Sequence, residues 1–169
     1  VLKTTFGKQA GYPDLHVLDS TDPAQIRAVE KTIQPATTLF IVSSKSGSTL
    51  EPNVFKQYFF DRITRLVGPK EAGRRFLAIT DPGSKMQQVA ERDDFRRIFL
   101  GWPNIGGRYS ALSYFGLVPA ALLGVDIRRL LERARRMAAA CASRVSARQN
   151  PGLRLGATLG GFGHAGRDK

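Results

Sequence analysis

The chain has 169 residues, 42% hydrophobic and 24% charged, a composition that is typical of one soluble globular domain and excludes a disordered, collagen-like or coiled-coil chain. One cysteine, Cys141, and two histidines exclude an internal disulfide and a cysteine or histidine metal site, so we expect no metal. We expect no cofactor either. The net charge of +12, from 26 basic and 14 acidic residues, fits a solvated arginine-rich surface better than a nucleic-acid-binding face, because the basic residues are scattered along the chain.

The N-terminal part of the chain predicts two strands, each followed by a helix. A short strand is expected at residues 15–18, followed by a helix over residues 21–33 with proline in its first turn. Residues 38–42 are apolar without alternation, which is typical of a strand covered on both faces. A serine-rich loop then leads to a helix over residues 51–66. The apolar stripe of this helix comprises Phe55, Tyr58, Phe59, Ile63 and Leu66.

The C-terminal part continues the alternation of β-rich and amphipathic segments. The strands are expected at residues 75–80 and 95–100, and the helices at residues 85–92, 113–123, 127–144 and from about 151. The longest weakly charged stretch is too short to span a membrane, and Pro119 interrupts it. We expect no signal peptide, and therefore a cytoplasmic protein that binds neither membrane nor nucleic acid.

Strands separated by helical segments indicate βαβ units, and right-handed crossovers place helices on both faces of a parallel sheet. We therefore expect an α/β fold, a three-layer αβα sandwich with a mostly parallel, doubly wound sheet. One domain is expected over residues 1–145, with residues 146–169 forming a helical extension or the start of a linker.

One loop at the carboxyl end of a predicted strand is rich in hydroxyl groups. Residues 43–49 read Ser-Ser-Lys-Ser-Gly-Ser-Thr and stand directly before a helix. Ligands of open parallel sheets bind at this edge, and hydroxyls together with the free N–H groups of a helix N-terminus can hold a phosphate. An ordinary N-cap ahead of Glu51 and Pro52 is the alternative, but a cap needs only one hydroxyl.

A second loop combines paired glycines with an arginine. Residues 104–110 read Asn-Ile-Gly-Gly-Arg-Tyr-Ser, and Gly106 and Gly107 permit positive φ and a close approach of the backbone to a ligand. Arg108 then supplies a guanidinium for an anionic group. A glycine turn with an exposed arginine is the alternative.

The two loops resemble those of a known family. Residues 105–116, Ile-Gly-Gly-Arg-Tyr-Ser-Ala-Leu-Ser-Tyr-Phe-Gly, resemble the phosphoglucose isomerase signature. Residues 40–51, Phe-Ile-Val-Ser-Ser-Lys-Ser-Gly-Ser-Thr-Leu-Glu, resemble that family's phosphate loop in its first sugar isomerase (SIS) domain. The resemblance covers nearly the whole chain. Residues 11–14 and 150–156 resemble the version that is fused behind transaldolase in bifunctional bacterial enzymes.

The resemblance implies an SIS-domain fold and an isomerase of glycolysis and gluconeogenesis that interconverts glucose 6-phosphate and fructose 6-phosphate through a cis-enediol. It assigns Glu51 to the acidic position beside the substrate and Arg108 to the enediolate, where a fixed guanidinium acts as charge develops. Gly106 and Gly107 bring the backbone close to the hexose 6-phosphate. The phosphate is held or bordered by five residues, Ser44, Lys45, Ser46, Ser48 and Thr49.

The resemblance also implies that this chain holds only part of the catalytic machinery. Proton abstraction next to a carbonyl needs a positioned base, and the family's basic glutamate and its ring-opening histidine and lysine come from segments downstream of these residues. The expected partners are therefore a second SIS domain of the same chain and, as in relatives, a second copy in a homodimer. A non-catalytic SIS module that senses a phosphosugar is the alternative, although such a sensor has no need of an arginine that faces an enediolate.

Overall fold

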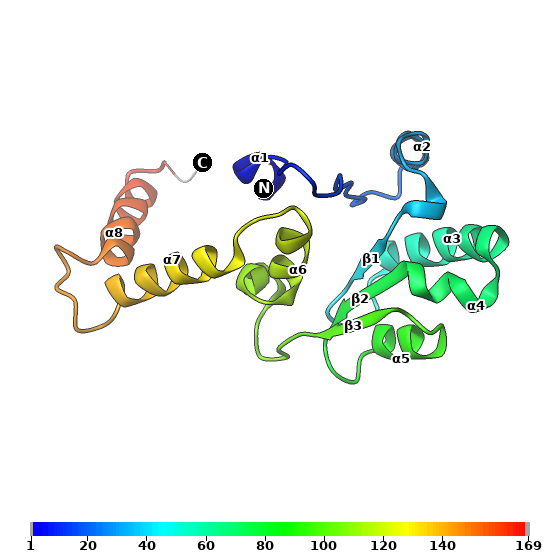
Figure 1. Cartoon of the computed structure of the whole chain (residues 1–169). Helices are drawn as coiled ribbons and strands as arrows, with labels where there is room; N and C mark the ends of the chain where they lie inside the picture. Colours follow the sequence, from blue (N-terminus) through cyan, green and yellow to red (C-terminus); the bar gives the residue numbers. More distant parts are fainter. Residues whose placement is uncertain (1, 168–169) are drawn as a thin grey trace. The chain divides into compact units, whose positions relative to one another are not determined.

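The computed structural model describes residues 2–167 (Figure 1). The helices are α1 (Leu2–Phe6), α2 (Pro23–Thr32), α3 (Leu50–Val67), α4 (Pro69–Ala72), α5 (Lys85–Arg92), α6 (Tyr114–Leu122), α7 (Ile127–Ala140) and α8 (Pro151–His164). The strands are β1 (Phe40–Ser43), β2 (Phe76–Thr80) and β3 (Arg97–Leu100). The chain divides into two compact units between Val125 and Asp126. The domain boundary expected after residue 145 stays a prediction.

Three parallel strands form the sheet, in the order β1-β2-β3. Phe40 of β1 lies opposite Phe76 of β2, and Leu77 of β2 lies opposite Arg97 of β3. The central strand β2 is buried along its whole length, which explains its uninterrupted apolar sequence. α3 lies between β1 and β2 in the chain, and α5 lies between β2 and β3. The predicted α/β fold with a parallel sheet is confirmed.

Helices cover both faces of the sheet and make three layers (Figure 1). On one face, Val42 belongs to a buried cluster with Phe59 of α3 and Met86 of α5. On the other face α6 contacts β2, and the rings of Tyr114 and Phe99 lie 5.4 Å apart. Each large apolar side chain buried in this way contributes about 1.5–3 kcal/mol. The core therefore holds the strands at a fixed register, and with them the loops at their ends.

Two predicted elements differ from the structure. Residues 15–18 form no strand: the segment pairs with no strand within residues 2–167, so its β-forming residues alone do not produce a ladder. α7 ends at Ala140, four residues before the predicted end. The N–H of Cys141 closes the helix on the carbonyl of Met137 at 3.0 Å, and the following serines disfavour helical backbone because their hydroxyls compete for it.

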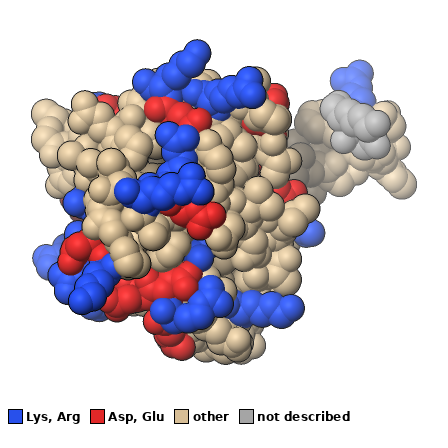
Figure 2. Space-filling view, turned by 90° about the vertical axis from the view of Figure 1, so that its right-hand side faces the viewer, with Lys and Arg blue, Asp and Glu red and all other residues tan. Residues whose placement is uncertain are grey.

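Charges of both signs share the surface shown in Figure 2, where lysine and arginine side chains lie among aspartates and glutamates. Arg62 pairs with Glu30 at 2.7 Å, and Arg92 pairs with Asp93 at 2.8 Å. This interspersion supports the predicted solvated surface. The expectation that the chain binds no nucleic acid stays a prediction. Within the described part of the chain, no helix has both the length and the hydrophobicity to traverse a bilayer.

Candidate functional site

The two predicted loops leave the sheet at the same edge. The hydroxyl turn (Ser44–Thr49) follows β1 and the arginine turn (Trp102–Arg108) follows β3. Because the strands are parallel, their carboxyl ends lie together, with the end of β2 between them. The N–H of Gly101 donates to the carbonyl of Thr80 at 2.7 Å, which ties the start of the second loop to β2. Two motifs that are distant in sequence are thus neighbours across one strand.

The hydroxyl turn exposes three of its hydroxyl-bearing residues and buries a fourth. Ser44 is buried, and its Oγ accepts a hydrogen bond from the N–H of Gly47 at 3.2 Å. Ser46 Oγ accepts from the N–H of Ser48 at 3.2 Å and lies 2.7 Å from Ser48 Oγ. Ser46, Ser48 and Thr49 are exposed. Ser44 therefore closes the turn from inside, while the other three can reach a bound anion.

Gly47 allows the turn to pack against the start of α5. Its φ is +69°, and a Cβ added there would lie 2.3 Å from the backbone nitrogen of Met86. An L-residue avoids this φ, and no side chain fits between two backbones at that distance. Glycine is therefore required at this position by both conformation and packing.

α3 begins directly after the hydroxyl turn and adds the N–H groups of its first turn. The side chain of its N-cap residue, Thr49, makes no capping hydrogen bond within residues 2–167. The Nδ2 of Asn53 donates instead to the carbonyls of Gly47 at 2.9 Å and Thr49 at 2.7 Å, which fixes the turn on the helix. The first N–H groups of a helix lack internal partners and carry partial positive charge. Together with the exposed hydroxyls they favour an anion such as phosphate.

The arginine turn contacts the hydroxyl turn through Lys45. Lys45 Nζ donates to Trp102 O at 3.1 Å and to Asp81 Oδ1 at 2.8 Å. Lys45 Cδ lies 3.9 Å from the position of a Cβ built on Gly107. Arg108, the next residue, is exposed. The sequence analysis did not assign Asp81 or Trp102 to the site. Their positions were the available signal, because Asp81 is the first residue after β2 and Trp102 the second residue after β3.

Gly106 and Gly107 do not have the positive φ that the sequence suggested. The φ of Gly106 is −62°. A Cβ would lie 3.5 Å from the ring of Tyr109 at Gly106, and 3.9 Å from Lys45 at Gly107, both ordinary van der Waals distances. Neither conformation nor packing among the described residues demands glycine here. The absence of side chains instead leaves the backbone open to close approach by a ligand.

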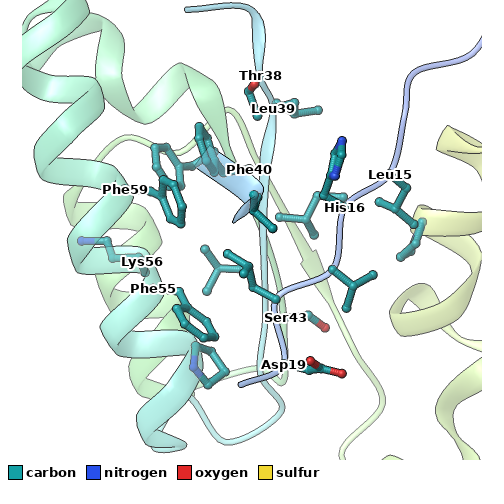
Figure 3. Close-up of a pocket in the computed structure, with 18 of the residues that line it drawn as sticks. Leu15, His16, Asp19, Thr38, Leu39, Phe40, Ser43, Phe55, Lys56 and Phe59 are labelled. Carbon is teal, nitrogen blue, oxygen red and sulfur yellow. The ribbon is translucent and has the colours of Figure 1, made fainter. Parts of the chain in front are cut away.

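A largely apolar cavity lies beside β1. Its volume is about 540 Å³, and Phe40, Phe55 and Phe59 contribute to its lining (Figure 3). Thr49 and Glu51 also line it. Ser46, Ser48 and Arg108 do not line it, so the cavity adjoins the candidate phosphate site at Thr49 and Glu51 and does not contain the whole of it. Within residues 2–167, no three His, Cys, Asp or Glu side chains gather as they would around a metal ion.

A match to a family model shows the family of this chain. Residues 1–157 match the family model described as Phosphoglucose isomerase. The chain belongs to the phosphoglucose isomerase family. Every residue predicted to bind or act on substrate, from Ser44 to Arg108, lies inside the matched range. The finer resemblance to transaldolase-fused members of the phosphoglucose isomerase family stays a prediction.

The curated relatives of this member of the phosphoglucose isomerase family are longer than the chain itself. It is 38% identical over 135 residues to a glucose-6-phosphate isomerase from Carboxydothermus hydrogenoformans, a match that covers 78% of the chain and 28% of the relative. It is 42% identical over 130 residues to a glucose-6-phosphate isomerase from a Cyanothece strain, covering 73% of the chain and 23% of the relative. The chain thus spans about a quarter of the length of these relatives.

Solved structures resemble the chain in fold. A hypothetical protein from Thermus thermophilus superposes with a TM-score of 0.80 at 31% identity, over 88% of this chain and 35% of that one. A glucose-6-phosphate isomerase from Chlamydia trachomatis superposes with a TM-score of 0.71 at 31% identity, over 85% of this chain and 27% of that one. The α/β architecture is therefore shared with a segment of that glucose-6-phosphate isomerase.

Proposed function

We propose that this chain supplies the phosphate-binding edge and the arginine of an isomerase that interconverts glucose 6-phosphate and fructose 6-phosphate. The observation that carries the proposal is the meeting of the hydroxyl turn and the arginine turn at one edge of the sheet, joined by the hydrogen bond from Lys45 Nζ to Trp102 O at 3.1 Å. Names of the curated relatives and family membership supply the reaction and the substrate. Cytoplasmic location and a homodimer belong to the same proposal.

The phosphate of the substrate binds at the hydroxyl turn. Ser46, Ser48 and Thr49 donate to its oxygens, and the N-terminal N–H groups of α3 add partial positive charge. Ser44 and Lys45 border the site, Ser44 by shaping the turn from inside. This arrangement holds a phosphate monoester without a metal ion, because hydroxyls and backbone N–H groups satisfy its oxygens directly.

The sugar end of the substrate extends toward the arginine turn. The backbone of Gly106 and Gly107 lets the substrate approach closely, and Arg108 stabilises the negative charge that develops on the enediolate. Glu51, exposed in the first turn of α3, occupies the family's acidic position beside the substrate. The base that moves the proton between C1 and C2 comes from another part of the protein, the second SIS domain, because in the family the position of Glu51 is not the base and the basic glutamate lies in a downstream segment.

Turnover by the full-length protein tests the role of Arg108. We expect Arg108→Ala to lower kcat for fructose 6-phosphate by about a hundredfold or more, since removing one preformed stabiliser of a developing oxyanion has effects of that order. Arg108→Lys keeps the charge without the planar fork and should retain part of the activity. A full-length protein that binds fructose 6-phosphate but shows no turnover would favour the phosphosugar sensor instead.

Loss of a hydroxyl in the turn should weaken phosphate binding. We expect Ser48→Ala or Thr49→Ala to reduce the affinity of the 169-residue chain for fructose 6-phosphate by about 1–3 kcal/mol, the range for a hydrogen bond to a charged group. Isothermal titration with fructose 6-phosphate measures the loss of affinity, and titration with fructose, which lacks the phosphate, serves as the comparison. Thr37→Ala, at an exposed threonine that precedes β1 and lies outside the turn, is the matched control. Unchanged affinity in both turn variants contradicts the assignment.

A methyl group on the arginine turn should weaken substrate binding without harming the fold. Gly106→Ala places its Cβ 3.5 Å from Tyr109, at ordinary contact distance, so we expect a change in the free energy of unfolding below about 1 kcal/mol. We expect KM for fructose 6-phosphate in the full-length protein to rise severalfold, because the methyl group occupies the path of the substrate. Urea unfolding and steady-state kinetics check the two halves. Unaltered kinetics would show that the backbone of Gly106 does not meet the substrate.

A further inference from the structure

We infer that Lys45 and Asp81 form a strut that positions the arginine turn, and that Lys45 is a positioning residue rather than a ligand of the phosphate. The inference rests on the proposed function and assigns part of its geometry to two residues. Lys45 leaves the end of β1, passes over the end of β2 and reaches the start of the segment after β3. A single side chain therefore connects the ends of all three strands.

The ammonium group of Lys45 is already engaged. It donates to Asp81 Oδ1 at 2.8 Å and to Trp102 O at 3.1 Å, and it lies 5.4 Å from the centre of the Phe115 ring. The side chains of Lys45 and Asp81 are 23% and 18% exposed. An ammonium has three donors, and two of them have protein partners here. Within residues 2–167 the third donor has no hydrogen-bond partner, so Lys45 as a phosphate ligand would act through that donor alone or give up one of its two contacts.

The backbone around the pair fixes it further. The carbonyl of Lys45 accepts from the N–H of Asp81 at 3.1 Å and from Thr80 Oγ1 at 3.2 Å. A Cβ on Gly101 would lie 2.8 Å from Asp81 Oδ1 and 2.7 Å from the ring of Phe115, so Gly101 packs tightly against the carboxylate. Main chain and side chain of Lys45 are thus both held by residues at the end of β2.

The contact at Trp102 transmits this order to the arginine turn. The carbonyl that receives the Lys45 ammonium also accepts from the N–H of Ile105 at 3.1 Å, and this bond closes the turn that leads to Gly106. The alkyl stem of Lys45 faces the side-chain position of Gly107, with its Cδ 3.9 Å from where a Cβ would stand. The ion pair therefore sets the position of the Arg108 backbone relative to the hydroxyl turn that holds the phosphate.

The single tryptophan of the chain reports on this strut. Trp102 is 68% exposed, and its emission maximum and its quenching by acrylamide follow the arginine turn without a label. The variants are Lys45→Met, which keeps most of the stem, Asp81→Asn, which keeps the shape of the partner, and Lys45→Arg, which keeps the cation. Lys70→Met, at an exposed lysine of α4, controls for loss of a positive charge.

A strut and a phosphate ligand predict different results for these variants, and phosphate binding by Lys45→Met separates them most clearly. If Lys45 and Asp81 form a strut, Asp81→Asn and Lys45→Met each shift Trp102 quenching and lower kcat of the full-length protein about tenfold. KM for fructose 6-phosphate and competitive inhibition by inorganic phosphate then change less than about threefold. Lys45→Arg restores most of kcat, and the double variant is no worse than either single one. If Lys45 is instead a phosphate ligand, Asp81→Asn releases its ammonium and the protein binds inorganic phosphate equally or more tightly. Lys45→Met then weakens the binding of inorganic phosphate about tenfold.

The two proposals fail in different ways. If the full-length wild-type protein neither turns over fructose 6-phosphate nor binds inorganic phosphate, the proposed function fails, whatever Trp102 reports. If turnover is present but Asp81→Asn leaves kcat and Trp102 quenching at the values of Lys70→Met, the strut is overturned while the proposed function stands. Inhibition by inorganic phosphate that weakens tenfold in Lys45→Met also overturns it, since the lysine is then a direct ligand.

Discussion

Gly47→Ala should destabilise the chain and abolish phosphate binding together. The variant forces an L-residue to φ +69°, which costs about 1–2 kcal/mol, and places a methyl carbon 2.3 Å from the nitrogen and 2.9 Å from the Cβ of Met86. Because the obstacle is backbone, the turn and the start of α5 must separate. We expect a loss of about 2–4 kcal/mol in the free energy of unfolding, measured by urea titration, and no detectable heat with fructose 6-phosphate.

Gly83→Ala is the matched control for this prediction. Gly83 also has a positive φ, +74°, in the turn after β2, but a Cβ there meets nothing within 4 Å. Its alanine variant should lose only the conformational part, about 1–2 kcal/mol, and keep its affinity for fructose 6-phosphate. Equal losses in the two variants would show that the packing of Gly47 against Met86 contributes nothing.

The sequence predicted the positions of both turns because local chemistry determines them. A buried apolar strand ends where hydroxyls and glycine begin, and proline and glutamate start the helix that follows. The parallel order of the strands then places the ends of β1 and β3 at one edge. These steps need no knowledge of side-chain partners, and the α/β fold with a parallel sheet follows from them.

Contacts between distant residues could not be predicted in the same way. Lys45 and Asp81 are 36 positions apart, and their pairing depends on the register of β1 against β2. The close approach of Gly47 to Met86 likewise depends on how α5 packs beside the turn. The segment at residues 15–18 failed as a predicted strand for the converse reason, since its residues favour β structure but find no strand partner within residues 2–167.

α3 shows the limit of periodicity most clearly. The helical stripe predicted that Tyr58 and Leu66 are buried, yet they are 39% and 55% exposed. Lys56, which the pattern places among polar positions, is only 6% exposed. Its ammonium contacts the carboxylate of Asp93 and lies 4.3 Å from the centre of the Phe60 ring. A cation is tolerated in this apolar layer because a carboxylate after α5 faces it.

Asp93→Asn should therefore destabilise the chain more than Lys56→Met does. Removing the carboxylate leaves Lys56 buried without its counter-ion, and we expect a loss of about 3 kcal/mol. Lys56→Met removes the buried cation and fills its space, while Asp93 keeps Arg92 at 2.8 Å, so we expect a change within about 1 kcal/mol of wild type. Urea unfolding at pH 7 measures both. A larger loss in Lys56→Met than in Asp93→Asn would contradict the asymmetry.

The ion pair between Lys56 and Asp93 should also make the free energy of unfolding fall in acid. Burial acts to raise the pKa of Asp93, but the hydrogen bond from Arg92 and the hydrogen bond and charge of Lys56 outweigh it and hold that pKa below its ordinary value of 3.8. Because the folded chain binds this proton less readily than the unfolded chain, the stabilising contribution is present above about pH 4 and is lost as the pH falls through the lowered pKa. Urea midpoints measured from pH 6 to pH 3 should therefore drop more steeply in wild type than in Asp93→Asn. Parallel curves for the two proteins would show that the pKa of Asp93 is the same in the folded and the unfolded chain, so that Arg92 and Lys56 do not lower it.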